Sequence, residues 1–264
     1  MIRNMIEDRI GDLKGNIGIS YVDLNTGISC FTGNCDVFPS SGMVKLFLLI
    51  EIFHQLDSGK LHKEQIHALT SEDCSFFRKS ELDEPSYGVI SFLHEGLELN
   101  IRDLVYLMVT VSDNTAFNIL LQIAGMDNVN DTLRCYGYKD TVINRKLFDW
   151  DKINKGIDNY HSVKEVTDML HRLYLGQLIS SNASSEILEV LKHHQRTNVM
   201  PYYFPENMVI AHQSGFDMGM THDMGIVYAD NPFILCMSAS NVNTPNAESV
   251  MRDVAMICYR QSNS

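Results

Sequence analysis

One lysine in this chain is placed where a charged side chain could do chemistry. Lys45 stands between Val44 and Leu46 in the segment MVKLFLLIEIFHQL, which is apolar almost all round. A helix of this kind is usually buried in the centre of a domain, and a buried ammonium group needs hydrogen-bonding partners. We therefore expect Lys45 to be buried and paired.

Two polar clusters follow apolar runs and could supply those partners. The tripeptide SDN at 112–114 closes the run LVYLMVTV, and QSG at 213–215 lies in a stretch predicted to be a strand. Ser, Asp and Asn also end helices and cap the helices that follow, so a turn that caps a helix from Thr115 is the structural alternative for the first cluster.

The elements that position these groups follow from periodicity. An amphipathic helix is predicted over Met1–Leu13, and a hairpin over Ile17–Val22 and Ile28–Phe31 turns at Asn25-Thr26-Gly27. The buried helix around Lys45 should end near Ser58-Gly59. From Lys60 to Gln195 we expect an all-helical block, with helices over Ile101–Val111, Thr115–Ala124, Val129–Tyr136, Ser162–Leu175 and Ser184–His193.

The pattern changes again near the C-terminus. Short apolar runs over Met208–Gln213, Met224–Tyr228 and Phe233–Ser240 predict strands, and a helix follows with Thr244 as its N-cap and proline at its first position. Strands at both ends of the chain predict an α+β fold. We expect one domain over 1–264, with a sheet subdomain from about 1–37 and 200–264 and a helical one from about 38–199. A ligand site would lie between the two.

Composition excludes several classes of protein. The 264 residues carry a net charge of −12, whereas nucleic-acid binding needs a basic face. No run has the roughly 18 apolar residues of a membrane span, and no signal peptide is evident, so we expect a cytoplasmic monomer unless a secretory leader has been removed. The six cysteines show no C-x-x-C pattern and the ten histidines no H-E-x-x-H pattern. We therefore expect reduced, mostly buried thiols, no metal and no cofactor.

Three motifs together carry a family resemblance. FPSSGMVKLF at 38–47, SDN at 112–114 and AHQSG at 211–215 stand in the order of the S-x-x-K, S-D-N and K-T-G motifs of the class A serine β-lactamases and penicillin-recognising enzymes. GISYVDLNTG near the start and GMDNVNDTLRCYGYKDT after the second motif agree with this family. The chain therefore resembles a bacterial β-lactamase, a family of antibiotic-resistance hydrolases, over nearly its whole length. The resemblance implies an antiparallel sheet flanked by the terminal helices, with an all-helical subdomain.

The resemblance also implies roles for the first two motifs. In the family a serine attacks the lactam carbonyl, and a lysine one turn later takes or shuttles its proton. Here the lysine is Lys45, but the nucleophile position holds Gly42, which has no oxygen to attack with. Ser112 would transfer a proton to the leaving nitrogen. Asn114 would bond to the substrate amide and to Lys45, and Asp113 would tie the loop down.

The third motif departs from the family at its first position. Gln213 replaces a lysine whose charge attracts the substrate carboxylate, so affinity for anionic ligands should fall. Ser214 keeps a hydroxyl and Gly215 keeps close backbone access. The oxyanion hole would use the backbone N–H groups of Gly42 and Phe216, which do not depend on side chains.

The deacylating glutamate of class A enzymes has no counterpart in this chain. With Arg145 taken as the arginine that precedes it by two positions, Leu147 stands in its place, and the nearest carboxylate is Asp149. We therefore expect slow deacylation even if a serine were restored at residue 42.

Two interpretations of Gly42 remain open at this point. The first is a β-lactamase-type acyl hydrolase whose nucleophile has been replaced. The second is a non-catalytic relative that binds a peptide, a cell-wall fragment or another small ligand in the retained site. Ser41 is one residue too early for a nucleophile and should cap the helix instead. A glycosidase would need a carboxylate pair, and none stands out.

Overall fold

The computed structural model describes residues 2–11, 13–75 and 88–263, so Met1, where the first predicted helix begins, lies outside it. A five-stranded antiparallel sheet has the order β2-β1-β9-β8-β7. Its strands are β1 (Asn16–Asp23), β2 (Ser29–Gly33), β7 (Ile210–Asp217), β8 (Met220–Val227) and β9 (Phe233–Ser240). The N-terminal hairpin thus joins the three C-terminal strands through β1 and β9, and β7 is left at one edge.

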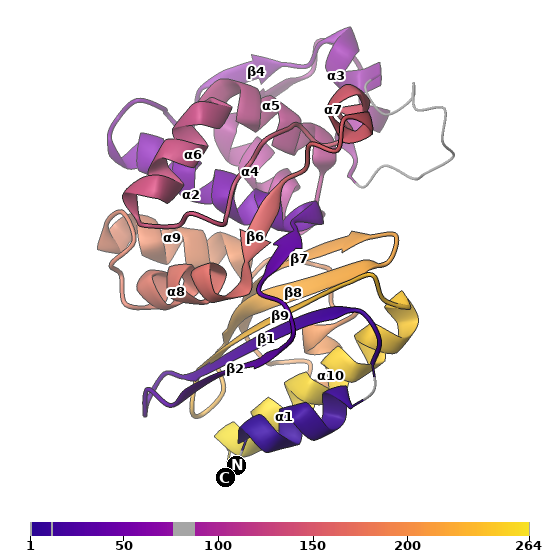
Figure 1. Ribbon diagram of the computed structural model, residues 1–264. Helices are drawn as coiled ribbons and strands as arrows, with labels where there is room; N and C mark the ends of the chain where they lie inside the picture. Colours follow the sequence, from indigo (N-terminus) through magenta and orange to yellow (C-terminus); the bar gives the residue numbers. More distant parts are fainter. Residues whose placement is uncertain (1, 12, 76–87, 264) are drawn as a thin grey trace.

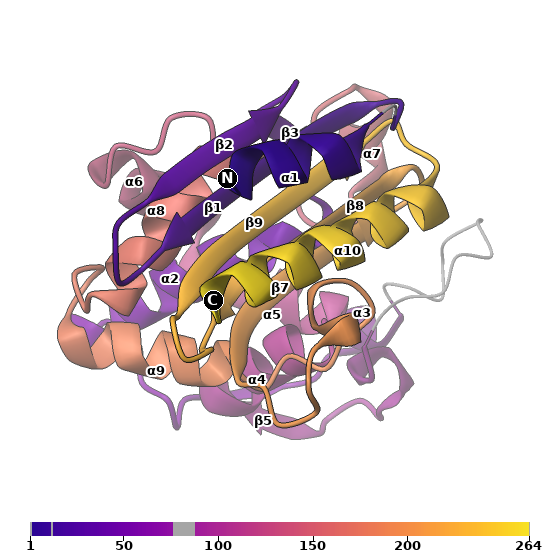
Figure 2. The same ribbon diagram turned by 90° about the horizontal axis from the view of Figure 1, so that it is seen from below.

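Two terminal helices cover one face of this sheet, as Figures 1 and 2 show. They are α1 (Ile2–Ile10) and α10 (Thr244–Ser262). Ile6 and Val254 of these helices are fully buried in one cluster with Leu235 of β9. Successive side chains of a strand point to opposite faces of the sheet. Leu235 of β9 therefore packs under the terminal helices, whereas its neighbours Ile234 and Cys236 belong to the core on the other face.

The other face packs against the helical part of the chain, whose centre is α2 (Val44–Asp57) (Figure 1). Eleven of its fourteen residues are buried, which confirms the prediction of a central helix. The remaining helices are α3 (Ser71–Ser75), α4 (Ile101–Thr110), α5 (Asn114–Ala124), α6 (Met126–Cys135), α7 (Trp150–Asn154), α8 (Val163–Tyr174) and α9 (Ser181–Leu191). The short 3-10 turns are η1 (Ser41–Met43), η2 (Ile90–Phe92) and η3 (Met200–Tyr203).

The prediction of an all-helical block was wrong in detail. β4 (Ile66–Ala68) pairs with β5 (Glu98–Asn100), and β3 (Val37–Pro39) pairs with β6 (Tyr160–Ser162). Each of these strands has three residues, which is too short to show an alternating pattern in the sequence. The β3–β6 pair matters for the site, because it leads the chain directly into η1.

Two smaller expectations also need correction. The N-cap of α10 is Asn243, whose side chain accepts a hydrogen bond from the Asn246 backbone N–H at 3.1 Å, and not Thr244. Pro245 has no N–H, so the Asn243 side chain accepts from the next residue, Asn246. All six cysteines are free thiols, as expected, but only Cys74, Cys236 and Cys258 are buried.

Candidate active site

Lys45 lies at the centre of a buried polar cluster. Its side chain is 1% exposed, and Nζ donates to Ser112 Oγ at 3.0 Å and to Asn114 Oδ1 at 2.7 Å. The first turn of α2 and the loop between α4 and α5 bring these three side chains together. Burial lowers the pKa of Lys45 to about 7, although nearby Asp113 opposes this effect and Arg196 adds to it. An amine with such a pKa can both take up and release a proton near neutral pH.

The loop at 112–114 is held in an uncommon conformation. Ser112 has φ +57°, in the left-handed region, and Asp113 is the N-cap of α5. The Asp113 carboxylate accepts from the Ala116 N–H at 2.9 Å and from the Val89 and Ile90 N–H groups at 2.6 and 2.9 Å. The cap therefore also fixes the segment that precedes η2, and it leaves Ser112 and Asn114 directed at Lys45.

Gly42 lies in η1, against the edge strand β7. A Cβ atom at this position would lie 2.8 Å from the Ser214 carbonyl oxygen and 3.2 Å from Gly215 Cα, closer than side chains normally approach a backbone. The reverse contact is also tight, because a Cβ atom at Gly215 would lie 3.1 Å from the backbone nitrogens of Gly42 and Met43. The two glycines let η1 and β7 touch through their backbones.

Ser41 does not cap the helix, so that expectation was wrong. Its φ is +44°, and its hydroxyl donates to the Phe216 carbonyl oxygen at 2.6 Å. The outer carbonyls of an edge strand have no strand partner, and Ser41 satisfies this one. Ser41 thus links η1 to β7 beside Gly42.

The side chains of β7 differ from the pattern that the resemblance implies. Gln213 is 1% exposed, and its Nε2 donates to the carbonyl oxygen of Ser214 at 3.0 Å, while its Oε1 has no partner among the described residues. Phe216 is 38% exposed, and the Arg196 guanidinium lies over its ring at 5.5 Å from the centroid. Arg196 therefore provides a positive charge beside the strand where Gln213 provides none.

Sequence reasoning missed two residues of the segment between α9 and η3. One is Arg196, and the other is His194, which is buried and bonds to both Ser214 and the Val109 carbonyl oxygen. No motif in the sequence marks either residue. Within the described part of the chain, no group of three or more His, Cys, Asp or Glu side chains could hold a metal ion.

The loop before α7 carries an apolar residue at the position expected for a glutamate. Leu147 is 8% exposed and belongs to the core of the helical part. Its backbone N–H and carbonyl both bond to the Asn118 side chain, at 3.0 Å each, which fixes it against α5. Arg145 donates to Asp158 at 2.7 Å, and Asp149 caps α7 instead of facing Lys45. This loop, which lies within the described residues, therefore has no carboxylate at the position where the resemblance implies a glutamate.

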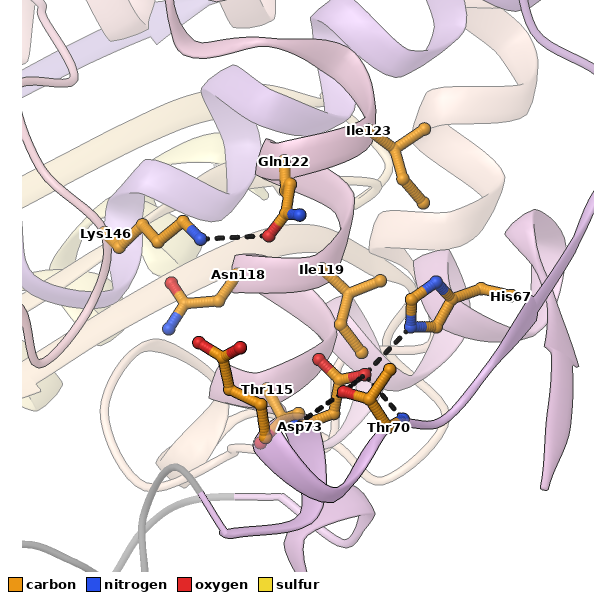
Figure 3. Close-up of a pocket in the computed structure, with 10 residues that line it drawn as sticks. His67, Thr70, Asp73, Thr115, Asn118, Ile119, Gln122, Ile123 and Lys146 are labelled. Atoms are coloured by element: carbon orange, nitrogen blue, oxygen red, sulfur yellow. Dashed lines mark hydrogen bonds and ion pairs between the residues drawn. The ribbon is translucent and has the colours of Figure 1, made fainter. Parts of the chain in front are cut away.

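A separate hollow of about 190 Å³ lies on the outer side of α5 (Figure 3). Thr115, Asn118 and Gln122 line it from the helix, and Lys146 bonds to Gln122 Oε1 at 3.1 Å across it. The opposite wall holds a hydrogen-bonded group of His67, Asp73 and Thr70. Figure 3 shows the bond between Lys146 and Gln122 and the bonded group on the opposite wall, and none of the residues predicted for the site lines the hollow.

Comparison with known proteins identifies the fold and the family. A family model described as the Beta-lactamase enzyme family matches residues 1–262. The chain belongs to this family. β-Lactamase VEB-1 of Pseudomonas aeruginosa is 24% identical over 272 residues, which cover 96% of this chain and 88% of VEB-1.

Solved structures agree with the β-lactamase fold. A β-lactamase from Sphaerobacter thermophilus superposes with a TM-score of 0.85 at 23% identity, covering 99% of this chain and 97% of its own. PBP-A superposes with a TM-score of 0.85 at 21% identity, covering 99% and 96%. The predicted α+β, β-lactamase-like fold is therefore confirmed, and these relatives do not favour the alternative of a non-catalytic binding protein. None of the described helices is both long and apolar enough to cross a membrane.

Proposed function

We propose that the region between η1, the 112–114 loop and β7 is a β-lactam-recognising acyl-transfer site in which residue 42 cannot be acylated. The observation that carries this proposal is the buried cluster of Lys45, Ser112 and Asn114 beside a glycine. This cluster can hold and move a proton, but the adjacent residue has no nucleophilic oxygen. The ligand class is a β-lactam or a peptidoglycan-like amide, bound by one protein chain without a cofactor.

Charge and hydrogen bonding at β7 support an anionic ligand that is bound weakly. Arg196 supplies one cation near Phe216, whereas the neutral Gln213 directs its amide N–H to its own strand. A charge-assisted hydrogen bond is roughly twice as strong as a neutral one, so loss of the lysine weakens carboxylate binding without removing it. Leu147 has no carboxylate to activate water, so an acyl group on a serine introduced at residue 42 would be hydrolysed slowly.

The test compares the natural chain with Gly42→Ser and Gly42→Ala. Benzylpenicillin should bind all three in calorimetry, but only Gly42→Ser should gain the mass of one penicillin in intact-mass spectrometry. Gly42→Ala is the matched control, because it adds the same Cβ atom without the hydroxyl.

Two results would contradict the proposal. One is an adduct on Ser41 of the natural chain, because that would make the neighbouring serine the nucleophile. The other is the absence of both binding and labelling in the natural chain and in Gly42→Ser, because the site would then not recognise a β-lactam.

A further inference from the structure

A second serine in the site is bonded to a histidine. Ser214 Oγ lies 2.8 Å from His194 Nε2, and His194 Nδ1 lies 2.6 Å from the Val109 carbonyl oxygen. A carbonyl oxygen can only accept, so Nδ1 carries the hydrogen and Nε2 of the neutral ring accepts from the Ser214 hydroxyl. A serine hydroxyl that donates to a histidine with a fixed tautomer is the arrangement of a nucleophile and its general base.

The surroundings hold this histidine in place. The ring of His212 packs against the ring of His194 edge to face at 4.7 Å, and His212 is itself bonded to the buried carboxylate of Asp223 at 2.8 Å. Desolvation by burial, helped by the nearby His212, Arg196 and Lys45, lowers the pKa of His194 well below its usual value. The ring is therefore neutral, which is the form that can accept a proton from a serine.

A purely structural role for His194 accounts for only half of its bonds. The carbonyls at the end of α4 lack partners within the helix, and His194 Nδ1 and the Gln195 N–H satisfy those of Val109 and Thr110. This capping role uses Nδ1 alone. It does not require a serine at Nε2, and it brings the histidine to the end of the helix from which the 112–114 loop departs.

We propose that Ser214 and His194 form a serine–histidine pair that accepts an acyl group from an activated ester bound beside Gly42. Ser214 Oγ forms a bond to the ester carbonyl carbon, and its proton moves to His194 Nε2. The bond between that carbon and the alcohol oxygen then breaks, and the leaving alkoxide takes the proton from His194. Ser214 lies on β7 directly after Gln213, and His194 reaches it from the segment between α9 and η3. The ester would therefore enter the same site as the proposed β-lactam ligand.

A fluorophosphonate probe tests whether Ser214 is nucleophilic. Its phosphorus should bond to Ser214 Oγ with loss of fluoride, and peptide mapping should find the label on Ser214. Ser214→Ala should lose the label, whereas Ser29→Ala, a matched control at an exposed serine of β2 outside the site, should keep it. Ser214→Cys should restore reaction with an acyl ester if the alanine variant fails only for lack of a nucleophile.

The base is tested with His194→Gln, whose amide N–H can still bond to the Val109 carbonyl oxygen. Acyl transfer from p-nitrophenyl acetate to Ser214, followed by the release of p-nitrophenol, should slow by on the order of 10²-fold in this variant, as expected for loss of a general base. In the natural chain the rate should persist between pH 8 and pH 6, because the low pKa of His194 keeps its ring neutral there. A reaction that used Lys45 as base would instead decline below about pH 7, where that amine becomes protonated.

The inference is overturned if the natural chain is not labelled, if Ser214→Ala is labelled as fast as the natural chain, or if the label lies on another residue. It does not depend on penicillin binding. Calorimetry with benzylpenicillin on the same preparation therefore separates failure of this inference from failure of the proposed function.

Discussion

A methyl group at residue 42 should destabilise this protein, although the same change at an unhindered helical glycine would stabilise it. The new Cβ atom would lie 2.8 Å from the Ser214 carbonyl oxygen, and ordinary contact begins at 3.4 Å, so η1 and β7 must separate by the difference, 0.6 Å. β8 holds β7 on its inner side, where Ser214 pairs with Asp223. The bond from Ser41 to Phe216 holds β7 toward η1.

The size of the effect follows from two opposing terms. Overpacking of a close contact costs about 1–3 kcal/mol. Replacing glycine also restricts the unfolded chain, which returns about 0.4–1 kcal/mol. With mid-range values of about 2 and about 0.7 kcal/mol, the net loss should be about 1.3 kcal/mol. Each kcal/mol lowers Tm by roughly 2–4 °C in a protein of this size.

Scanning calorimetry on Gly42→Ala and Gly42→Ser measures this loss directly. Both variants should melt below the natural chain, because they add the same Cβ atom. The loss should be smaller when Ser41→Ala is combined with either change, since removal of the Ser41 to Phe216 bond lets β7 move away. If Gly42→Ala melts at or above the temperature of the natural chain, the contact between η1 and β7 is not as close as described, and the reasoning fails.

Three further predictions concern charge and burial. His161 and His222 are fully buried, and burial lowers the pKa of both. Stability should therefore fall as pH drops below about 6.5, by up to about 1.4 kcal/mol per pH unit for each ring. The free energy of unfolding, measured with urea across pH 4–8, should depend less steeply on pH in His222→Gln. In His62→Gln, a control at an exposed site, the pH dependence should be unchanged. For Lys45 the sign is the same but the pH window is higher, because the folded pKa near 7 lies below the usual value of 10.5. Stability should therefore rise from pH 7 to pH 10, and Lys45→Met should remove that rise. Asp113→Ala should cost at least about 2 kcal/mol in urea unfolding, because three backbone donors lose a charged acceptor; an unchanged midpoint would show that water replaces the carboxylate.

The elements that the sequence predicted well are those with long, regular patterns. The apolar segment around Lys45 is a buried helix, and the serine and asparagine of the 112–114 loop do meet the lysine. A buried amine requires hydrogen-bond partners. Polar residues that follow directly on a buried apolar run, such as those at 112–114, are few, so the possible partners of Lys45 could be predicted.

The contacts that the sequence did not predict form only where the fold brings together segments that are far apart in the chain. His194 follows a helix without any motif, and only the fold brings it to Ser214. The bond from Ser41 to Phe216 depends on a left-handed backbone at a serine, which no pattern of residue types indicates. The short strands β4 and β5 were missed because three residues cannot display a period of two.

The pairing of β1 with β9 has a consequence for how the chain folds. Asn16 lies opposite Ser240, so the centre of the sheet joins residues that are 224 positions apart in the sequence (240 − 16). Until β9 leaves the ribosome, the N-terminal hairpin lacks its neighbour and the apolar surface beneath it is uncovered. Contacts of such long sequence separation form slowly, and chains waiting for them are prone to aggregate. We expect chains truncated before β9 to accumulate bound to chaperones or in inclusion bodies, even though η1, the 112–114 loop and β7, which form the proposed site, would already have been translated.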